Sequence, residues 1–186
     1  MRIRAASAED AAAIADIYRP YVAESYVSFE TEPPDAAEIA RRMAAGGDLY
    51  PWFGAEEEGR LVGYAYASPF RPRAAYRFAV ETTVYVRDGA HGRGFGAALY
   101  APLLEALERQ GFTQAIGAIS LPNPASVRLH ERFGFRHAGT YAQVGWKLGR
   151  WHDVGLWQRP LAVPAEPPEE PRLLRHQAAA RSDQGL

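Results

Sequence analysis

A strand, a glycine-rich turn and a helix follow one another directly between residues 80 and 99, and this stretch constrains the fold most. Residues 80–87 are rich in β-branched side chains, which is typical of a strand. Asp88 and Gly89 break the strand, and the turn HGRGFG (residues 91–96) leads into small, helix-forming residues. Such a turn presents backbone N–H groups at a helix N-terminus, where anions bind. The stretch therefore predicts an α/β chain with a phosphate-binding cradle.

The glycines alone fit an ordinary strand-to-helix turn equally well. Arg93 adds a cation where a diphosphate would lie. Neither a P-loop lysine nor an acidic residue about 20 positions downstream follows the turn, so an ATP-type or NAD site is not supported. A diphosphate site of another kind is the interpretation that we carry forward.

Composition excludes several classes of protein. The 186 residues carry a net charge of −1, which disfavours a broad nucleic-acid or membrane surface. The chain has no cysteine, so disulfides, thiolate metal sites and a cysteine nucleophile are excluded, and its five histidines lack metal-ligand spacing. It has no apolar run long enough for a signal peptide or a membrane span. We expect a cytoplasmic protein without a metal.

Hydrophobic periodicity and turn signals divide the chain into alternating elements. One α/β domain is expected over residues 1–161, with a mixed sheet and helices on both faces. The proline-rich, charged residues 162–186 are expected to form a disordered tail. Pro20 should end or bend the first helix and Pro102 should bend the third. Strands are expected at 2–6, 50–56, 61–68, 79–87, 113–121, 135–143 and 154–160, and helices at 7–20, 33–46, 94–110 and 123–134, with a Gly/Trp-rich connection at 144–153.

Glu81 is the candidate general base. It is the acidic residue of its strand, and it shares a face with Thr83 and Tyr85. A partly desolvated carboxylate there could take a proton from a substrate. The alternative is an exposed edge position. His130 lies one helical turn after Ser126, and taken alone it is more often structural than catalytic.

The loop before this strand, residues 69–78, carries three arginines and three aromatic residues. Arg71, Arg73 and Tyr76 suit recognition of a carboxylate, phosphinate or sulfonyl oxygen. A solvated basic loop is the equally weighted alternative.

Several short motifs, in this order and at this spacing, resemble the GNAT acyltransferase superfamily over about residues 2–161. Within it, the closest resemblance is to phosphinothricin and methionine sulfoximine N-acetyltransferases. The motifs are FETEP (29–33), YPW (50–52), AY (75–76), ETTVYV (81–86), HGRGFG (91–96), LPN (121–123), SVR (126–128), LHERFGF (129–135) and WHDVG (151–155).

This resemblance implies a mixed, mostly antiparallel sheet that is splayed where acetyl-CoA enters, between strands 79–87 and 113–121. It implies Glu81 as general base, directly or through water, and His130 as either acid or base. The implied cofactor-binding residues are Val84, Tyr85, Val86, His91, Gly92, Arg93, Gly94, Phe95, Gly96, Ala97 and Asn123. The implied substrate-binding residues are Phe29, Arg71, Arg73, Tyr76, Thr83 and Tyr85.

The chain departs from the family pattern at three positions. His91 opens the pyrophosphate turn where the pattern has Gln or Arg, and Arg93 is the candidate replacement. Arg71 stands where related enzymes often carry lysine. Pro102 is unusual in its helix.

The predicted function is direct transfer of an acetyl group from acetyl-CoA to the amino group of a small amino-acid-like substrate. Phosphinothricin, methionine sulfoximine and methionine sulfone are the expected types, with resistance or metabolic detoxification as equally compatible roles. Two alternatives are an N-acetyltransferase for a polyamine, antibiotic or protein N-terminus, and a non-catalytic acyl-CoA-binding module. The resemblance also implies a homodimer.

Overall fold

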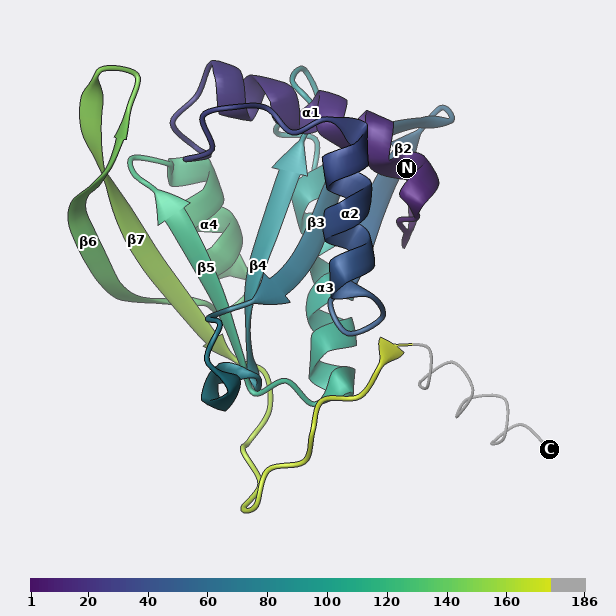
Figure 1. Cartoon of the computed structure of the whole chain (residues 1–186), viewed down its shortest axis with the longest axis vertical. Helices are drawn as coiled ribbons and strands as arrows, with labels where there is room; N and C mark the ends of the chain where they lie inside the picture. Colours follow the sequence, from purple (N-terminus) through teal and green to yellow (C-terminus); the bar gives the residue numbers. More distant parts are fainter. Residues whose placement is uncertain (175–186) are drawn as a thin grey trace.

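The computed structural model describes residues 1–174 of the 186. Within these residues, four helices and seven strands follow one another along the chain, with runs of adjacent strands between the helices (Figure 1). Two short 3-10 turns, η1 (Ala8–Asp10) and η2 (Ala74–Tyr76), complete the order. The elements are β1 (Arg2–Ala5), α1 (Ala11–Ala23), α2 (Ala36–Gly46), β2 (Trp52–Glu57), β3 (Arg60–Pro69), β4 (Ala79–Val86), α3 (Phe95–Gln110), β5 (Gln114–Ser120), α4 (Pro124–Arg132), β6 (Arg136–Lys147) and β7 (Arg150–Pro160).

The seven strands form one mixed sheet in the order β1-β2-β3-β4-β5-β7-β6. Every neighbouring pair is antiparallel except β4 and β5, which run parallel. Among the described residues, β4 and β5 pair over three positions that end at Glu81 opposite Ile116, although both strands continue beyond this point. The predicted mixed, mostly antiparallel sheet is confirmed.

Helices cover both faces of the sheet, as the sequence predicts. Alternating strand residues feed two apolar cores, because successive side chains point to opposite faces. Tyr64 of β3 joins the core beneath α1 and α2, which includes Ile14 and Ile39. Its neighbour Ala65 joins the core beneath α3, which includes Leu99 and Leu103.

Both helices that contain a proline continue past it: α1 does not end at Pro20, and α3 contains Pro102 as the sequence predicts, while a bend at either proline stays a prediction. α1 runs three residues beyond Pro20 to Ala23. Near Pro102, Tyr100 and Leu103 of the same helix are fully buried. Burial of this apolar face outweighs the local cost of an interior proline, which is about 3 kcal/mol.

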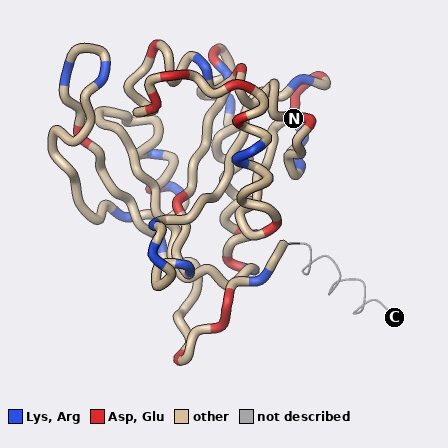
Figure 2. The backbone as a smooth tube through the Cα atoms, in the orientation of Figure 1, with Lys and Arg blue, Asp and Glu red and all other residues tan. Residues whose placement is uncertain are grey.

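The last two strands are longer than predicted. Residues 144–153 are not a connection: β6 extends to Lys147, β7 begins at Arg150, and Leu148 and Gly149 make the turn with positive φ values of 50° and 75°. Lys147 and Arg150 stand on either side of this turn, at the tip of the hairpin. Figure 2 shows two basic segments there. The two-residue turn was not predicted from the sequence because leucine is an unusual residue for a left-handed turn position.

Part of the predicted tail is described. Residues 162–174 form no long helix or strand, but Arg172 N–H donates to the Gln110 carbonyl (2.7 Å) and Leu174 N–H donates to the Asp48 carbonyl (2.9 Å). Glu170 pairs with Arg77 at 2.7 Å. Residues 175–186 lie outside the described residues, so the domain boundary and the disorder of the tail stay predictions.

Candidate active site

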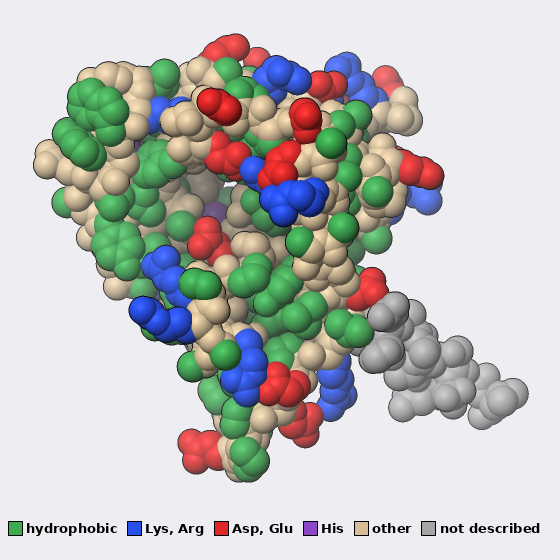
Figure 3. All heavy atoms as spheres, in the orientation of Figure 1, with side chains coloured by type: hydrophobic (Ala, Val, Ile, Leu, Met, Phe, Trp, Pro, Cys, Tyr) green, Lys and Arg blue, Asp and Glu red, His purple; other side chains and the backbone are tan. Residues whose placement is uncertain are grey.

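A cavity of about 470 Å³ lies beside β4, and Glu81 and His130 both line it. Figure 3 shows the hollowed face of the molecule. We call it the acceptor cavity. Three elements contribute most of its wall: β4, the end of β5, and the segment 27–30 between α1 and α2. Its lining residues are Tyr18, Val27, Ser28, Phe29, Glu30, Tyr66, Glu81, Thr82, Thr83, Val84, Tyr85, Ala118, Ile119, Ser120, Asn123, Ser126, His130 and Val154.

Glu81 is half-buried, at the last paired position of β4 with β5. Burial raises the pKa of its carboxyl, and the positive charge of Arg71 opposes that increase. A carboxylate with a raised pKa is a stronger base than an exposed one. The location and the electrostatics therefore suit proton abstraction from a bound amine.

His130 is buried, and it is the last member of a series of hydrogen bonds that also includes Thr82 and Tyr100. Its Nδ1 lies 2.8 Å from the Ser126 carbonyl, which can only accept, so Nδ1 carries the proton. Burial lowers the pKa of the imidazole, which keeps the ring neutral at pH 7. Nε2 therefore accepts from the Tyr100 hydroxyl (2.9 Å), and the Tyr100 oxygen accepts from Thr82 (2.5 Å). Sequence reasoning missed Tyr100 because one tyrosine on a helix face looks like an ordinary core residue.

A second space of about 470 Å³ follows the glycine-rich turn, and we call it the cofactor groove. Gly92 and Gly94 adopt positive φ values of 75° and 87°, which a residue with a Cβ rarely adopts. Gly94 is the N-cap of α3, whose first N–H groups have no intrahelical acceptor. These free N–H groups fit a phosphate, as the sequence predicts.

The cofactor groove and the acceptor cavity share five lining residues. A molecule in one space therefore reaches the other along β4 and the start of α4. The predicted cofactor-binding residues that line the groove are Val84, Tyr85, Val86, His91, Gly92, Gly94, Phe95, Gly96, Ala97 and Asn123. The residues that line both the groove and the cavity are Val27, Val84, Tyr85, Asn123 and Ser126.

Arg93 does not line the groove. Its guanidinium pairs with Glu57 at 2.6 Å and lies 5.2 Å from the centre of the Phe95 ring. That Arg93 replaces the residue missing at His91 stays a prediction. His91 itself lines the groove, and its Nε2 lies 2.7 Å from the Tyr21 hydroxyl.

Arg128 and Arg132 of α4 do line the groove, and sequence reasoning did not select them. They stand four residues apart, so they lie on the same side of the helix. This i, i+4 spacing after Asn123 is the signal that could have found them.

The arginine loop lies outside the acceptor cavity. Arg71, Arg73 and Tyr76 are exposed, and none of them lines the cavity. The Arg71 guanidinium lies 4.9 Å from the centre of the Phe70 ring, and Arg71 reaches the site only through its charge on Glu81. The predicted direct contacts of these three residues with the substrate stay predictions.

The other predicted substrate residues, Phe29, Thr83 and Tyr85, all line the cavity. Glu30 lies beside them and was not predicted. Its carboxylate accepts from the Tyr18 hydroxyl (2.9 Å) and from Arg42 (2.7 and 2.9 Å). Arg42 lowers the pKa of the Glu30 carboxyl despite its partial burial.

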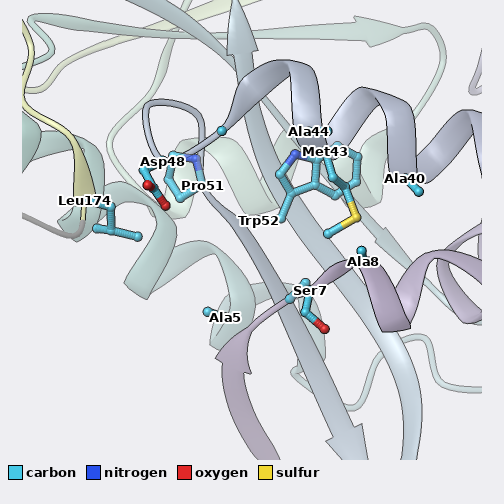
Figure 4. Close-up of a pocket in the computed structure, with 12 residues that line it drawn as sticks. Ala5, Ser7, Ala8, Ala40, Met43, Ala44, Asp48, Pro51, Trp52 and Leu174 are labelled. Carbon is cyan, nitrogen blue, oxygen red and sulfur yellow. The ribbon is translucent and has the colours of Figure 1, made fainter.

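A third cavity, of about 290 Å³, lies between β1, α2 and Leu174 (Figure 4). Its wall is mainly apolar, with Met43, Trp52 and several alanines. Its polar side chains are those of Ser7 and Asp48. Within residues 1–174, no group of three or more His, Asp or Glu side chains could hold a metal ion, and no helix could cross a membrane.

The family model of the acetyltransferase (GNAT) family matches residues 12–135. The chain belongs to the GNAT family. It is 46% identical to a phosphinothricin N-acetyltransferase of Streptomyces viridochromogenes over 90% of this chain and 91% of that protein. It is 36% identical to an L-methionine sulfoximine/L-methionine sulfone acetyltransferase of Pseudomonas aeruginosa over 84% of this chain and 92% of that protein.

Among solved structures, the chain is similar to a GNAT superfamily phosphinothricin acetyltransferase from Sinorhizobium meliloti in complex with acetyl-CoA. The TM-score is 0.86 at 39% identity, covering 94% of this chain and 98% of that chain. The predicted family and fold are confirmed. The GNAT chain described here is thus an N-acetyltransferase by family, with the acceptor cavity and the cofactor groove joined along β4.

Proposed function

We propose that this GNAT chain transfers the acetyl group of acetyl-CoA to the α-amino group of a small amino-acid-like substrate of the phosphinothricin, methionine sulfoximine or methionine sulfone type. The observation that carries the proposal is the joining of two spaces along β4, one at the glycine-rich turn and one lined by the half-buried carboxylate of Glu81. The similar proteins named above support the choice of substrate class.

Acetyl-CoA is the proposed occupant of the cofactor groove. The pyrophosphate would be held by N–H groups of the turn at Gly94 and Gly96, with Arg128 and Arg132 supplying positive charge. Backbone groups of Val84 and Val86 would hold the pantetheine arm, because β4 has no β5 partner beyond Glu81 among the described residues. This early end of the ladder supports the proposed splaying of the two strands.

Glu81 is proposed to free the amine for attack. An α-ammonium group with a pKa of about 9–10 must lose a proton, which costs roughly 3–4 kcal/mol at pH 7. The proton passes to Glu81, directly or through water. The amine nitrogen then bonds to the thioester carbon and loses its second proton, the C–S bond breaks, and coenzyme A leaves as a thiolate that takes up one proton to become the thiol.

His130 is the second proposed catalytic residue. Its neutral ring has a lone pair at Nε2 and no proton there to donate. This tautomer favours a role in helping to deprotonate the amine over protonation of the leaving thiolate. Thr82 and Tyr100 would relay the proton, because Thr82 lines the acceptor cavity and the Tyr100 hydroxyl links it to Nε2.

The test is an assay of thiol release from acetyl-CoA with methionine sulfoximine, methionine sulfone and phosphinothricin. Turnover well above hydrolysis is expected for at least one of them, and Glu81→Gln should lower kcat by about 10²–10⁴-fold with acetyl-CoA affinity unchanged. Turnover only with polyamines, antibiotics or peptides would overturn the substrate class. Acetyl-CoA binding by calorimetry without turnover of any amine would instead support a binding module.

We also propose a homodimer in the cytoplasm, where acetyl-CoA is available. The exposed apolar tip of the β6–β7 hairpin supports a second copy as its partner, since large apolar patches mark interaction sites. Its residues are Tyr141, Val144, Trp146, Leu148 and Trp151, each at least half exposed.

A further inference from the structure

Lys147 is the only lysine among the 21 lysine and arginine residues of the chain. It lies at the end of β6 and is only 7% exposed. Every other basic position in this sequence carries arginine. The exception therefore marks a position where the shape of the cation matters.

The ammonium of Lys147 holds two carbonyls on either side of one residue. Its Nζ donates to the Ser28 carbonyl at 2.6 Å and to the Glu30 carbonyl at 2.7 Å, and Phe29 stands between them. A compact tetrahedral ammonium can donate to two such oxygens, whereas a planar guanidinium points its donors in a fixed fork. Burial lowers the pKa of the Lys147 ammonium, and the nearby Glu30 charge opposes this decrease.

The same hairpin makes two further contacts with this segment. The Tyr26 ring stacks on His152 of β7, with ring centres 4.5 Å apart and planes within 13°. The Phe29 ring packs directly on Gly145 of β6, where a Cβ would collide with it. On the other side, Tyr18 and Arg42 hold the Glu30 carboxylate. The segment is thus fixed between the hairpin and the α1–α2 pair.

We propose that Lys147 is a positioning residue for the acceptor site, acting through segment 27–30. Lys147 does not line the acceptor cavity, but Val27, Ser28, Phe29 and Glu30 all do. By fixing the carbonyls beside Phe29, the ammonium sets where this ring stands in the cavity wall. The proposal rests on the proposed function, because it assigns the acceptor to this cavity.

The first test is Lys147→Met, which keeps the length of the side chain and removes its donors. We expect KM for the acceptor to rise about tenfold, while KM for acetyl-CoA and kcat change less than about twofold. The matched control is Arg136→Met, which removes an exposed cation from the same strand and should leave all three constants unchanged. Unaltered acceptor KM in folded Lys147→Met enzyme would overturn the proposal.

The second test uses Phe29 to separate positioning from general loss of stability. Gly145→Ala should displace the Phe29 ring and raise the acceptor KM in the same selective way. In a Phe29→Ala background, neither Lys147→Met nor Gly145→Ala should raise it further, because the shared mediator is gone. Full additivity in this cycle would show that Lys147 does not act through Phe29.

A third measurement needs no variant at Lys147. Selective ¹³C labelling at the Cε of lysine gives a single signal in this protein, because Lys147 is its one lysine. We expect methionine sulfoximine to shift the Cε signal while acetyl-CoA alone leaves it in place. If the chemical shift of the Cε signal does not change when methionine sulfoximine is added, in wild-type enzyme that is shown to acetylate it, the proposal is contradicted. Absence of turnover with every acceptor would instead count against the proposed function.

Discussion

The chemistry of single residues in this enzyme depends on partial burial. Glu81 stands where β4 loses its β5 partner, so its carboxyl is shielded from water while it still faces the acceptor cavity. Burial raises its pKa, and Arg71 lowers it through charge alone. Arg71 does not line the cavity, so its contribution at the site is electrostatic.

This electrostatic contribution predicts a pH shift. A general base works only when ionised, so kcat/KM should fall as the pH drops through the raised pKa of Glu81. Arg71→Met removes a charge that stabilises the carboxylate, so the acid limb should move to higher pH. Arg73→Met is the matched control, and its acid limb should coincide with that of wild type. Coincident limbs for Arg71→Met and wild type would contradict the role assigned to Arg71.

At the scale of elements, β5 and α4 are fitted to one another around His130. Gly117 of β5 lies against the imidazole, and a Cβ at this position would collide with Nε2. The ring is held from α4 by Ser126 and from α3 by Tyr100. Three elements therefore determine the position of one ring, and glycine is required because the ring approaches the strand backbone so closely.

Gly117→Ala is expected to destabilise the fold by about 1–3 kcal/mol, because an added methyl group overpacks a closely packed site. Thermal unfolding should show a lower Tm, and kcat should fall as the ring is displaced. The double variant Gly117→Ala/His130→Ala provides the control. Without the ring, the added methyl group should cost much less, and an equal cost in both backgrounds would refute the collision as its cause.

For the whole molecule, the β6–β7 hairpin is the most exposed apolar feature that is described. Trp146 and Trp151 are 59% and 55% exposed, and their rings contact one another at 5.3 Å between centres. Lys147, beside the turn of the same hairpin, holds the segment that lines the acceptor cavity. A partner bound at the tip would therefore lie close to the substrate site.

Sedimentation velocity should detect a dimer of the wild-type chain. Trp146→Glu/Trp151→Glu should yield monomers, because two buried charges without partners strongly oppose association. The monomer should keep the acetyl-CoA affinity of wild type, since the cofactor groove is formed by other elements. A wild-type chain that sediments as a monomer would exclude the proposed dimer.

The sequence by itself determined most of the elements and predicted the chemistry of the groove. The strand, the glycine-rich turn and the helix at residues 80–99 are local features, and local conformational preferences specify them. Glu81 and the turn residues could be selected from their types and spacing, whereas Asn123 was selected through the resemblance to the GNAT superfamily. The same reasoning predicted a mixed sheet with helices on both faces, which the structure confirms.

Tertiary structure alone decided which candidates meet. Arg93 pairs with Glu57 and does not line the groove, although an arginine suits a phosphate. The arginine loop lies outside the cavity, although its residue types suit an acidic substrate. Contacts between segments far apart in the chain connect three further residues to the site: Tyr100 contacts His130, Glu30 is held by Arg42, and Lys147 holds the Ser28 carbonyl. Residue type and spacing specify what a side chain can do. Its partners depend on packing between distant segments, which no local pattern records.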